Sequence, residues 1–178
     1  MKLKKHSKIL IGIVVAVLLL TGITAGYLQS YYHTDTQAVS AYQYKQNSDT
    51  KIQTKMLSDG SIVCEPENPA AGFIFYPGGK VETSAYEPLM QACAAQDILC
   101  VLVSMPFHLA VFDKNAADGI QEQYPQIDSW YIGGHSLGGA MAASYVSKHA
   151  DSFDGLILLG AYSVSYTHLR AHETTLHL

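Results

Sequence analysis

The segment Trp130–Ala140 constrains the fold of this chain more than any other stretch. A short apolar run leads into Gly134-x-Ser136-x-Gly138, and an apolar helical pattern follows at once. A serine on so tight a turn leaves no room for side chains at the two glycine positions, because each would collide with a neighbouring strand or helix. The pattern therefore predicts a strand–turn–helix unit that raises Ser136 above the carboxyl edge of a sheet.

The same turn is suited to stabilising negative charge. Ser136 precedes a helix, whose first backbone amides are unsatisfied and whose dipole is positive at that end. The backbone N–H of Leu137 is thus the natural first donor to an oxyanion. A second glycine-rich element, Gly78-Gly79, follows an apolar strand and is the expected source of the other donor. The alternative without a functional role is that Gly78-Gly79 forms a plain turn between a strand and a helix.

The rest of the chain alternates between strand and helix patterns. Ser58-Asp59-Gly60 between two β-type runs, Lys51–Met56 and Ser61–Glu65, predicts a hairpin. Strands are expected at Gly72–Tyr76, Ile98–Val103, Ser129–Gly133 and Gly155–Leu159, and helices at Tyr86–Gln96, Asn115–Gln123 and Leu137–His149. The strands around Ile98 and Gly155 are apolar throughout, which is typical of buried parallel strands. This order predicts an α/β fold with a mostly parallel sheet and helices on both faces.

Three stretches, Ala71–Val81, Gly133–Ala140 and Phe153–Leu159, resemble the α/β-hydrolase superfamily, especially its membrane-anchored bacterial, dienelactone-hydrolase-like and esterase-like members. The resemblance covers about residues 51–162. It implies the α/β-hydrolase fold, a small-molecule ester or acyl substrate, and serine-dependent hydrolysis that needs no cofactor. Dienelactone hydrolases proper use a cysteine nucleophile, so Ser136 favours ester hydrolysis. Two alternatives stay open: an acyltransferase with the same turn, and a non-catalytic membrane-tethered binding domain.

The expected catalytic triad is not complete in this chain. In the α/β-hydrolase fold the acid and then the histidine follow the serine, each after a later strand. His135 adjoins Ser136 and is expected to support the turn, while His108 and His149 stand in the wrong part of the chain order. We therefore expect a fold that is incomplete at its C-terminus, and a chain that is inactive as written.

The tail, residues 163–178, is interpreted as non-native. Residues 164–174 match a translated frame of a transposase-type sequencing-library adapter. The competing interpretation is a metal or catalytic cluster in this tail. Its members would be His168, His172, Glu173 and His177. The long match to one adapter frame outweighs it, so no metal site is predicted.

The N-terminus predicts a membrane anchor. A basic segment, residues 1–8, precedes an uncharged apolar run, residues 9–28, which at 1.5 Å per residue would span about 30 Å. The lysines place the N-terminus in the cytoplasm and the rest outside it, on a polar stalk at residues 29–50. A signal peptide cleaved near Thr24-Ala25-Gly26 remains an alternative. A buried helix of a soluble core is the other alternative for this apolar run.

Composition narrows the possible partners. A formal net charge of −4 argues against a nucleic-acid partner, because there is no basic face to displace counterions. Cys64, Cys93 and Cys100 show no metal spacing and are expected to be structural, with a Cys93–Cys100 disulfide left open. The oligomeric state cannot be read from these patterns.

Overall fold

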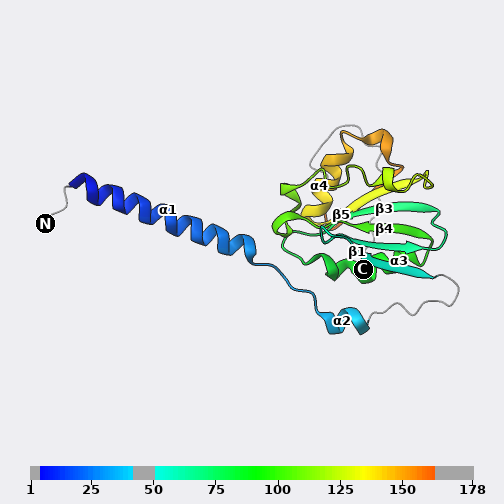
Figure 1. The fold of residues 1–178 in the computed structure, drawn as a ribbon. Helices are drawn as coiled ribbons and strands as arrows, with labels where there is room; N and C mark the ends of the chain where they lie inside the picture. Colours follow the sequence, from blue (N-terminus) through cyan, green and yellow to red (C-terminus); the bar gives the residue numbers. More distant parts are fainter. Residues whose placement is uncertain (1–4, 42–50, 163–178) are drawn as a thin grey trace. The chain divides into compact units, whose positions relative to one another are not determined.

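The computed structural model describes residues 5–41 and 51–162, which form two compact units divided after Tyr31 (Figure 1). The first unit contains one helix, α1 (Lys5–Gln29). Its stretch Ser7–Gln29, with a mean hydropathy of 2.6 in its most apolar window, is long and apolar enough to cross a membrane. A signal sequence meets the same criterion of length and composition.

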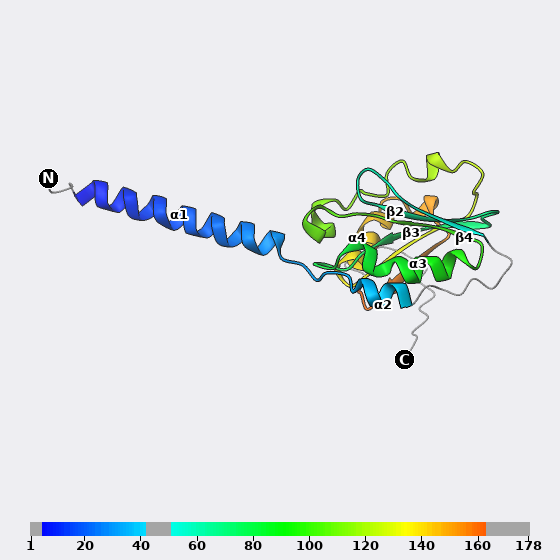
Figure 2. The same ribbon diagram turned by 60° about the horizontal axis from the view of Figure 1, so that its bottom comes forward.

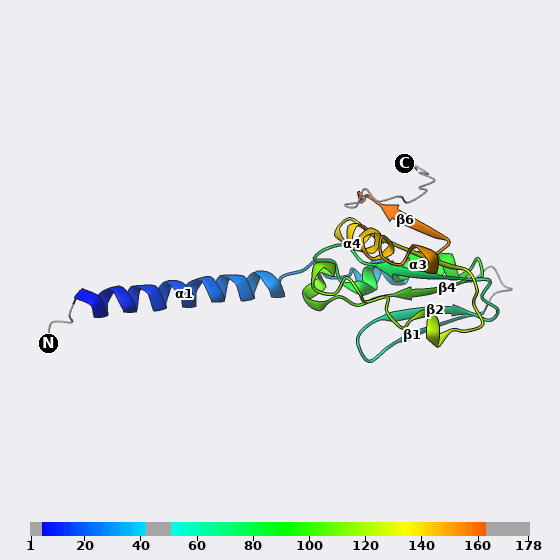
Figure 3. The same cartoon turned by 90° about the horizontal axis from the view of Figure 1, so that it is seen from above.

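The second unit is built on a six-stranded sheet with the order β1-β2-β4-β3-β5-β6. Its strands are β1 (Ile52–Met56), β2 (Ile62–Pro66), β3 (Ala71–Tyr76), β4 (Ile98–Leu102), β5 (Trp130–His135) and β6 (Gly155–Leu159). The hairpin β1–β2 joins the sheet antiparallel to β4, and the pairs from β4 through β3 and β5 to β6 are parallel. Figure 3 shows β1 and β6 at opposite ends of the sheet.

The α-helices of this unit are α2 (Thr36–Ala41), α3 (Glu87–Ala94) and α4 (Leu137–Val146). Two of them connect parallel strands, α3 between β3 and β4 and α4 between β5 and β6, while α2 precedes β1. Short 3₁₀ turns lie at Thr83–Tyr86, Pro106–His108, Ala110–Phe112, Gln121–Gln123 and Ala150–Ser152. Proline at the second position of α3 suits its first turn, because a proline there removes only an amide that has no partner in the helix.

The core has two halves, one on each face of the sheet. Side chains alternate along a strand, so Phe73 and Phe75 of β3 pack with Met90 of α3, whereas Ile74 and Tyr76 join the opposite cluster. That second cluster takes in α4 and the 105–127 segment. Figures 1 and 2 show α3 along one face of the strands, with α4 on the other side of the sheet.

Most of the expected architecture is confirmed. Gly72–Tyr76, Ile98–Val103, Trp130–Gly133 and Leu156–Leu159 contribute the neighbouring parallel strands, and the hairpin forms around Asp59 and Gly60. Gly60 adopts a positive φ of 86°, and the Asp59 carboxylate accepts hydrogen bonds from the amide and hydroxyl of Ser61. The turn is therefore stabilised by the left-handed glycine and the aspartate side chain that its sequence provides.

The helix expected at Asn115–Gln123 is wrong. The segment forms successive turns with i-to-i+3 bonds and only a short 3₁₀ turn at Gln121–Gln123. Gly119 lies in the left-handed region at φ 73°, which interrupts a helix. The buried hydroxyl of Tyr76 also fixes this segment, by donating to Lys114 O at 2.9 Å and accepting from Ala117 N at 3.0 Å.

The expectation that Gly155–Leu159 is buried is also wrong. Among the described residues β6 is the last strand of the sheet and pairs only with β5. Its residues are partly exposed, and Ile157 keeps 41% of its surface accessible. An apolar run predicts a strand, but its burial depends on what covers it.

The three cysteines occupy the helix and strand positions that were expected, and all are free thiols. Cys64 and Cys100 are buried opposite each other on β2 and β4. Burial raises the pKa of the Cys64 thiol to about 11. A hydrogen bond with Cys100 lowers the pKa of the partly buried Cys93 thiol to about 7.

We predict that Tyr76→Phe destabilises the second unit by about 1–3 kcal/mol, because it leaves the buried Ala117 amide without an acceptor. Urea unfolding of the chain in mild detergent measures the change. Tyr131→Phe is the matched control, since the Tyr131 hydroxyl has no hydrogen-bond partner among the described residues. Equal unfolding midpoints for the two variants would contradict the role given to Tyr76.

Candidate functional site

Ser136 stands at the junction between β5 and α4. Its backbone has φ 50° and ψ −119°, and its side chain is exposed. A non-glycine residue in this region is strained by about 1–3 kcal/mol, so the surrounding contacts must impose the conformation. The Ser136 amide donates to Leu159 O at 2.9 Å, which ties the turn to the end of β6.

Gly134 and Gly138 bring this turn against the end of β3. A Cβ on Gly138 would overlap the carbonyl oxygens of Tyr76 and Pro77. A Cβ on Gly134 would lie 2.5 Å from the Tyr76 carbonyl oxygen, a distance that real Cβ atoms do not reach. Both predicted glycines therefore stand where two segments of backbone touch.

The glycine loop, residues 77–82, leaves β3 beside this turn. A Cβ on Gly79 would meet the Leu137 side chain at 3.0 Å, so the two residues are neighbours. Leu137 is the first residue of α4, where no intrahelical acceptor is available to its amide. Within the described part of the chain, neither the Gly79 nor the Leu137 amide has a hydrogen-bond acceptor.

The Gly78 amide differs from these two. It donates to the hydroxyl of Tyr86 at 3.0 Å, and that hydroxyl also lies 2.9 Å from Nδ1 of His135. Since the hydroxyl accepts from Gly78, it can donate its own hydrogen to a neutral His135 that carries its proton on Nε2. Burial raises the pKa of Tyr86 and so keeps this donor protonated. The Gly78 amide is thus already engaged in a hydrogen bond with Tyr86.

Sequence reasoning missed Tyr86, which it treated only as the start of a helix. The distance of 49 residues to His135 carries no periodic signal, although a tyrosine soon after a glycine-rich loop is one chemical cue. A Cβ on Gly78 would lie 2.6 Å from His135 Nδ1 and 2.7 Å from the Tyr86 hydroxyl oxygen. The absence of a side chain at Gly78 therefore makes room for this network.

A second loop supports the glycine loop from the other side. The Lys80 amide donates to His108 O at 2.7 Å, while Lys80, Phe107 and His108 all adopt positive φ values of 53–62°. Burial lowers the pKa of His108, so its imidazole stays neutral near pH 7. Three strained residues without a glycine indicate a conformation held by tertiary contacts.

No acidic or basic side chain within residues 5–41 and 51–162 forms a hydrogen bond with Ser136. Its hydroxyl has no hydrogen-bond partner there. His149 stacks on Tyr145 with ring centres 4.1 Å apart, and His108 does not bond to Ser136. His168, His172, Glu173 and His177 lie outside the described residues. No three His, Cys, Asp or Glu side chains of the described chain converge as metal ligands would.

Comparison with known proteins gives a family and a fold. The profile of the Alpha/beta hydrolase family matches residues 72–176, which include the β3–β6 segment and reach into the proposed tail. The crystal structure of TT1662 from Thermus thermophilus is similar, with a TM-score of 0.51 and 15% identity over 62% of this chain. A search of curated proteins found no match.

Two further solved structures are similar to this chain at lower TM-scores. A thermostable carboxyl esterase from Bacillus coagulans gives a TM-score of 0.46 at 17% identity over 61% of this chain. The serine hydrolase FphF from Staphylococcus aureus gives 0.46 at 14% identity over 63%. This chain spans 57%, 43% and 56% of the lengths of the three structures, in the order given.

The profile match covers more than half of the 178 residues. The mostly parallel sheet, with the order β1-β2-β4-β3-β5-β6, accords with that match. The chain belongs to the Alpha/beta hydrolase family.

Proposed function

We propose that this chain carries the nucleophile of a serine hydrolase that cleaves ester or similar acyl bonds, with Ser136 as the attacking residue. The observation that carries the proposal is the exposed Ser136 at φ 50° on the turn before α4. Strain of this kind at an exposed hydroxyl has no packing benefit, and functional sites are where such strain is concentrated.

The proposed oxyanion hole consists of the Leu137 and Gly79 amides. Leu137 follows Ser136 in the chain, Gly79 lies against the Leu137 side chain, and neither amide has an acceptor in the described part of the chain. Gly78, the third donor that the sequence suggested, is a poorer candidate because its amide already donates to Tyr86. Tyr86 and His135 would then keep the loop in place without touching the reacting atoms.

The proposed reaction has two halves. Ser136 Oγ attacks the acyl carbon, its proton passes to a histidine base, and the oxyanion accepts hydrogen bonds from the Gly79 and Leu137 amides. The leaving alcohol takes that proton, and water then releases the acid by the same steps. Because His135 Nδ1 is engaged with Tyr86, the base and its acid are to be sought outside the described residues. This chemistry needs no cofactor.

We also propose that α1 is a single-pass membrane anchor with the second unit outside the cytoplasm. Its apolar stretch has no acidic residue, and Lys2, Lys4, Lys5 and Lys8 precede or begin it. Positive charge at one end favours retention of that end in the cytoplasm. The hydrolase unit would then act while tethered to a cell membrane.

We propose that the residues after Tyr162 are non-native. The first test therefore measures activity in a chain, the genomic form, whose residues after Tyr162 follow the genomic reading frame. Ser136→Ala should lower its hydrolysis of short p-nitrophenyl esters by on the order of 10⁴-fold or more, and abolish labelling by a fluorophosphonate. Ser144→Ala is the matched control, because Ser144 lies on the same helix and its side chain forms no hydrogen bond with the residues that the structure describes. Unchanged turnover by Ser136→Ala would end the proposal, and labelling without turnover would favour a binding domain.

The second test uses the 178-residue chain as written, which should show little or no esterase activity. Without its base, the serine hydroxyl is a negligible nucleophile at neutral pH. The profile match extends to residue 176, so the tail is tested directly. Turnover at the rate of the genomic form, lost on His168→Ala or His172→Ala, would show that the tail supplies the base and is native.

The anchor is tested by membrane fractionation. A fusion of the chain expressed in bacteria should stay with membranes after alkaline carbonate washing, because the α1 stretch provides a full apolar span. External protease should reach its second unit. A soluble product beginning near Gly26 would instead identify a cleaved signal peptide.

A further inference from the structure

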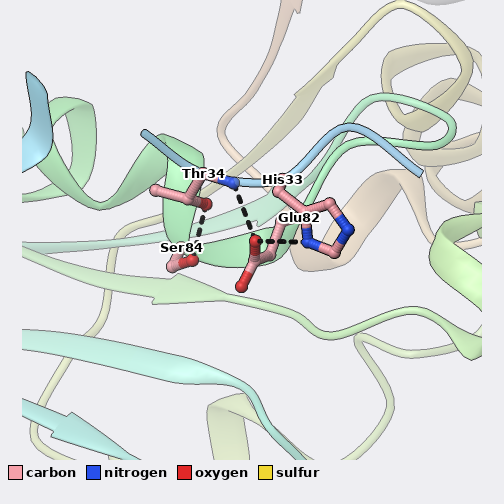
Figure 4. Close-up of polar contacts among 4 residues, drawn as sticks. All are labelled: His33, Thr34, Glu82 and Ser84. Atoms are coloured by element: carbon pink, nitrogen blue, oxygen red, sulfur yellow. Dashed lines mark hydrogen bonds and ion pairs between the residues drawn. The ribbon is translucent and has the colours of Figure 1, made fainter. Parts of the chain in front are cut away.

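Residues 32–34, within the segment 29–50 that was expected to be a stalk, pair with the glycine loop of the second unit. The strap, residues 32–34, lies beside the glycine loop and the turn after it (Figure 4). Tyr32 forms a parallel bridge with Val81, in which its amide donates to Lys80 O at 2.7 Å and its carbonyl accepts from the Glu82 amide at 3.0 Å. The compact unit accordingly begins at Tyr32, not near residue 51.

Side chains add to this pairing. The Thr34 amide donates to Glu82 Oε2 at 2.7 Å, and the Thr34 and Ser84 hydroxyls lie 2.7 Å apart. The hydrogen bond from the Thr34 amide is the main cause that lowers the pKa of Glu82. His33 Nδ1 lies 3.7 Å from the same carboxylate oxygen, but the His33 side chain is 73% exposed, so this pair contributes little.

The glycine loop depends on such outside partners. Lys80 holds a left-handed conformation at φ 62°, which a lysine adopts only when neighbours impose it. The Lys80 amide donates to the His108 carbonyl, and the Lys80 carbonyl accepts from the Tyr32 amide. The Glu82 amide donates to the Tyr32 carbonyl. Two of these three bonds come from the strap.

We propose that the strap is a positioning element that fastens the glycine loop and thereby holds the Gly79 amide beside Ser136. The role of Gly79 rests on the function proposed above. Only Ser30 and Tyr31 separate the end of α1 from the strap, so the apolar helix continues almost directly into the segment that orders the loop.

Proline substitutions separate the strap from its surroundings. Thr34→Pro removes the amide that donates to Glu82 and the hydroxyl that meets Ser84. Thr36→Pro is the matched control, because Thr36 is the first residue of α2, a position that suits proline. Its backbone amide donates no hydrogen bond to the described residues, so the substitution removes none. Glu82→Gln keeps an acceptor for Thr34, whereas Glu82→Ala removes it.

Hydrogen exchange of the full chain in detergent, read by mass spectrometry, is the experiment. Wild type and Thr36→Pro should protect peptides covering residues 31–35 and 79–84. Thr34→Pro and Glu82→Ala should exchange on the order of tenfold faster there, with Glu82→Gln intermediate. Unprotected exchange of both peptides in wild type, or equal exchange in the two proline variants, would contradict the proposal that the strap holds the glycine loop.

A kinetic comparison tests positioning in the genomic form. If the strap holds a transition-state donor, Thr34→Pro should lower kcat with p-nitrophenyl acetate several-fold at unchanged KM, and Thr36→Pro should not. Faster exchange with an unchanged kcat would overturn the link to Gly79. Failure of the proposed function looks different, because the genomic form would then hydrolyse no ester while the exchange pattern of the strap persisted.

Discussion

The close approach of the β5–α4 turn to the end of β3 governs the arrangement of this site. Gly134 and Gly138 touch the carbonyls of Tyr76 and Pro77, and a methyl group at either position would push the two segments apart. That contact fixes the direction in which α4 leaves the sheet and forces Ser136 into its strained conformation. It also places the first amide of α4 beside Gly79, so one backbone contact sets both the hydroxyl and its proposed donors.

The glycine loop is held by the nearby Tyr86 and by two segments that are distant in sequence. Tyr86 binds the Gly78 amide, His108 accepts from Lys80, and Tyr32 bonds to both Lys80 and Glu82. Each bond is worth about 1 kcal/mol on its own, yet together they satisfy the polar backbone of a loop that is not in regular structure. This leaves the Gly79 amide as the one in the loop that has no acceptor among the described residues.

The sequence predicts the scaffold well because its signals are local. Apolar runs mark the strands, and the spacing Gly134-x-Ser136-x-Gly138 marks the turn. Prediction from the sequence fails where the conformation of a segment depends on contacts with residues distant in the chain. The turns around Gly119 follow from that glycine and from the buried Tyr76 hydroxyl, which overrides the helical pattern. The strap was missed because its docking is mostly main-chain: the Tyr32 side chain remains 76% exposed and leaves no apolar signature.

The most direct measurement is a crystal structure of the genomic form after reaction with a phosphonate ester. The account predicts a phosphorus bond to Ser136 Oγ, with one phosphonyl oxygen about 2.7–3.1 Å from both the Gly79 and Leu137 amide nitrogens. The Gly78 amide should still donate to Tyr86, as it does at 3.0 Å here. An adduct on another residue, or a phosphonyl oxygen turned away from Gly79 and Leu137, would contradict the account.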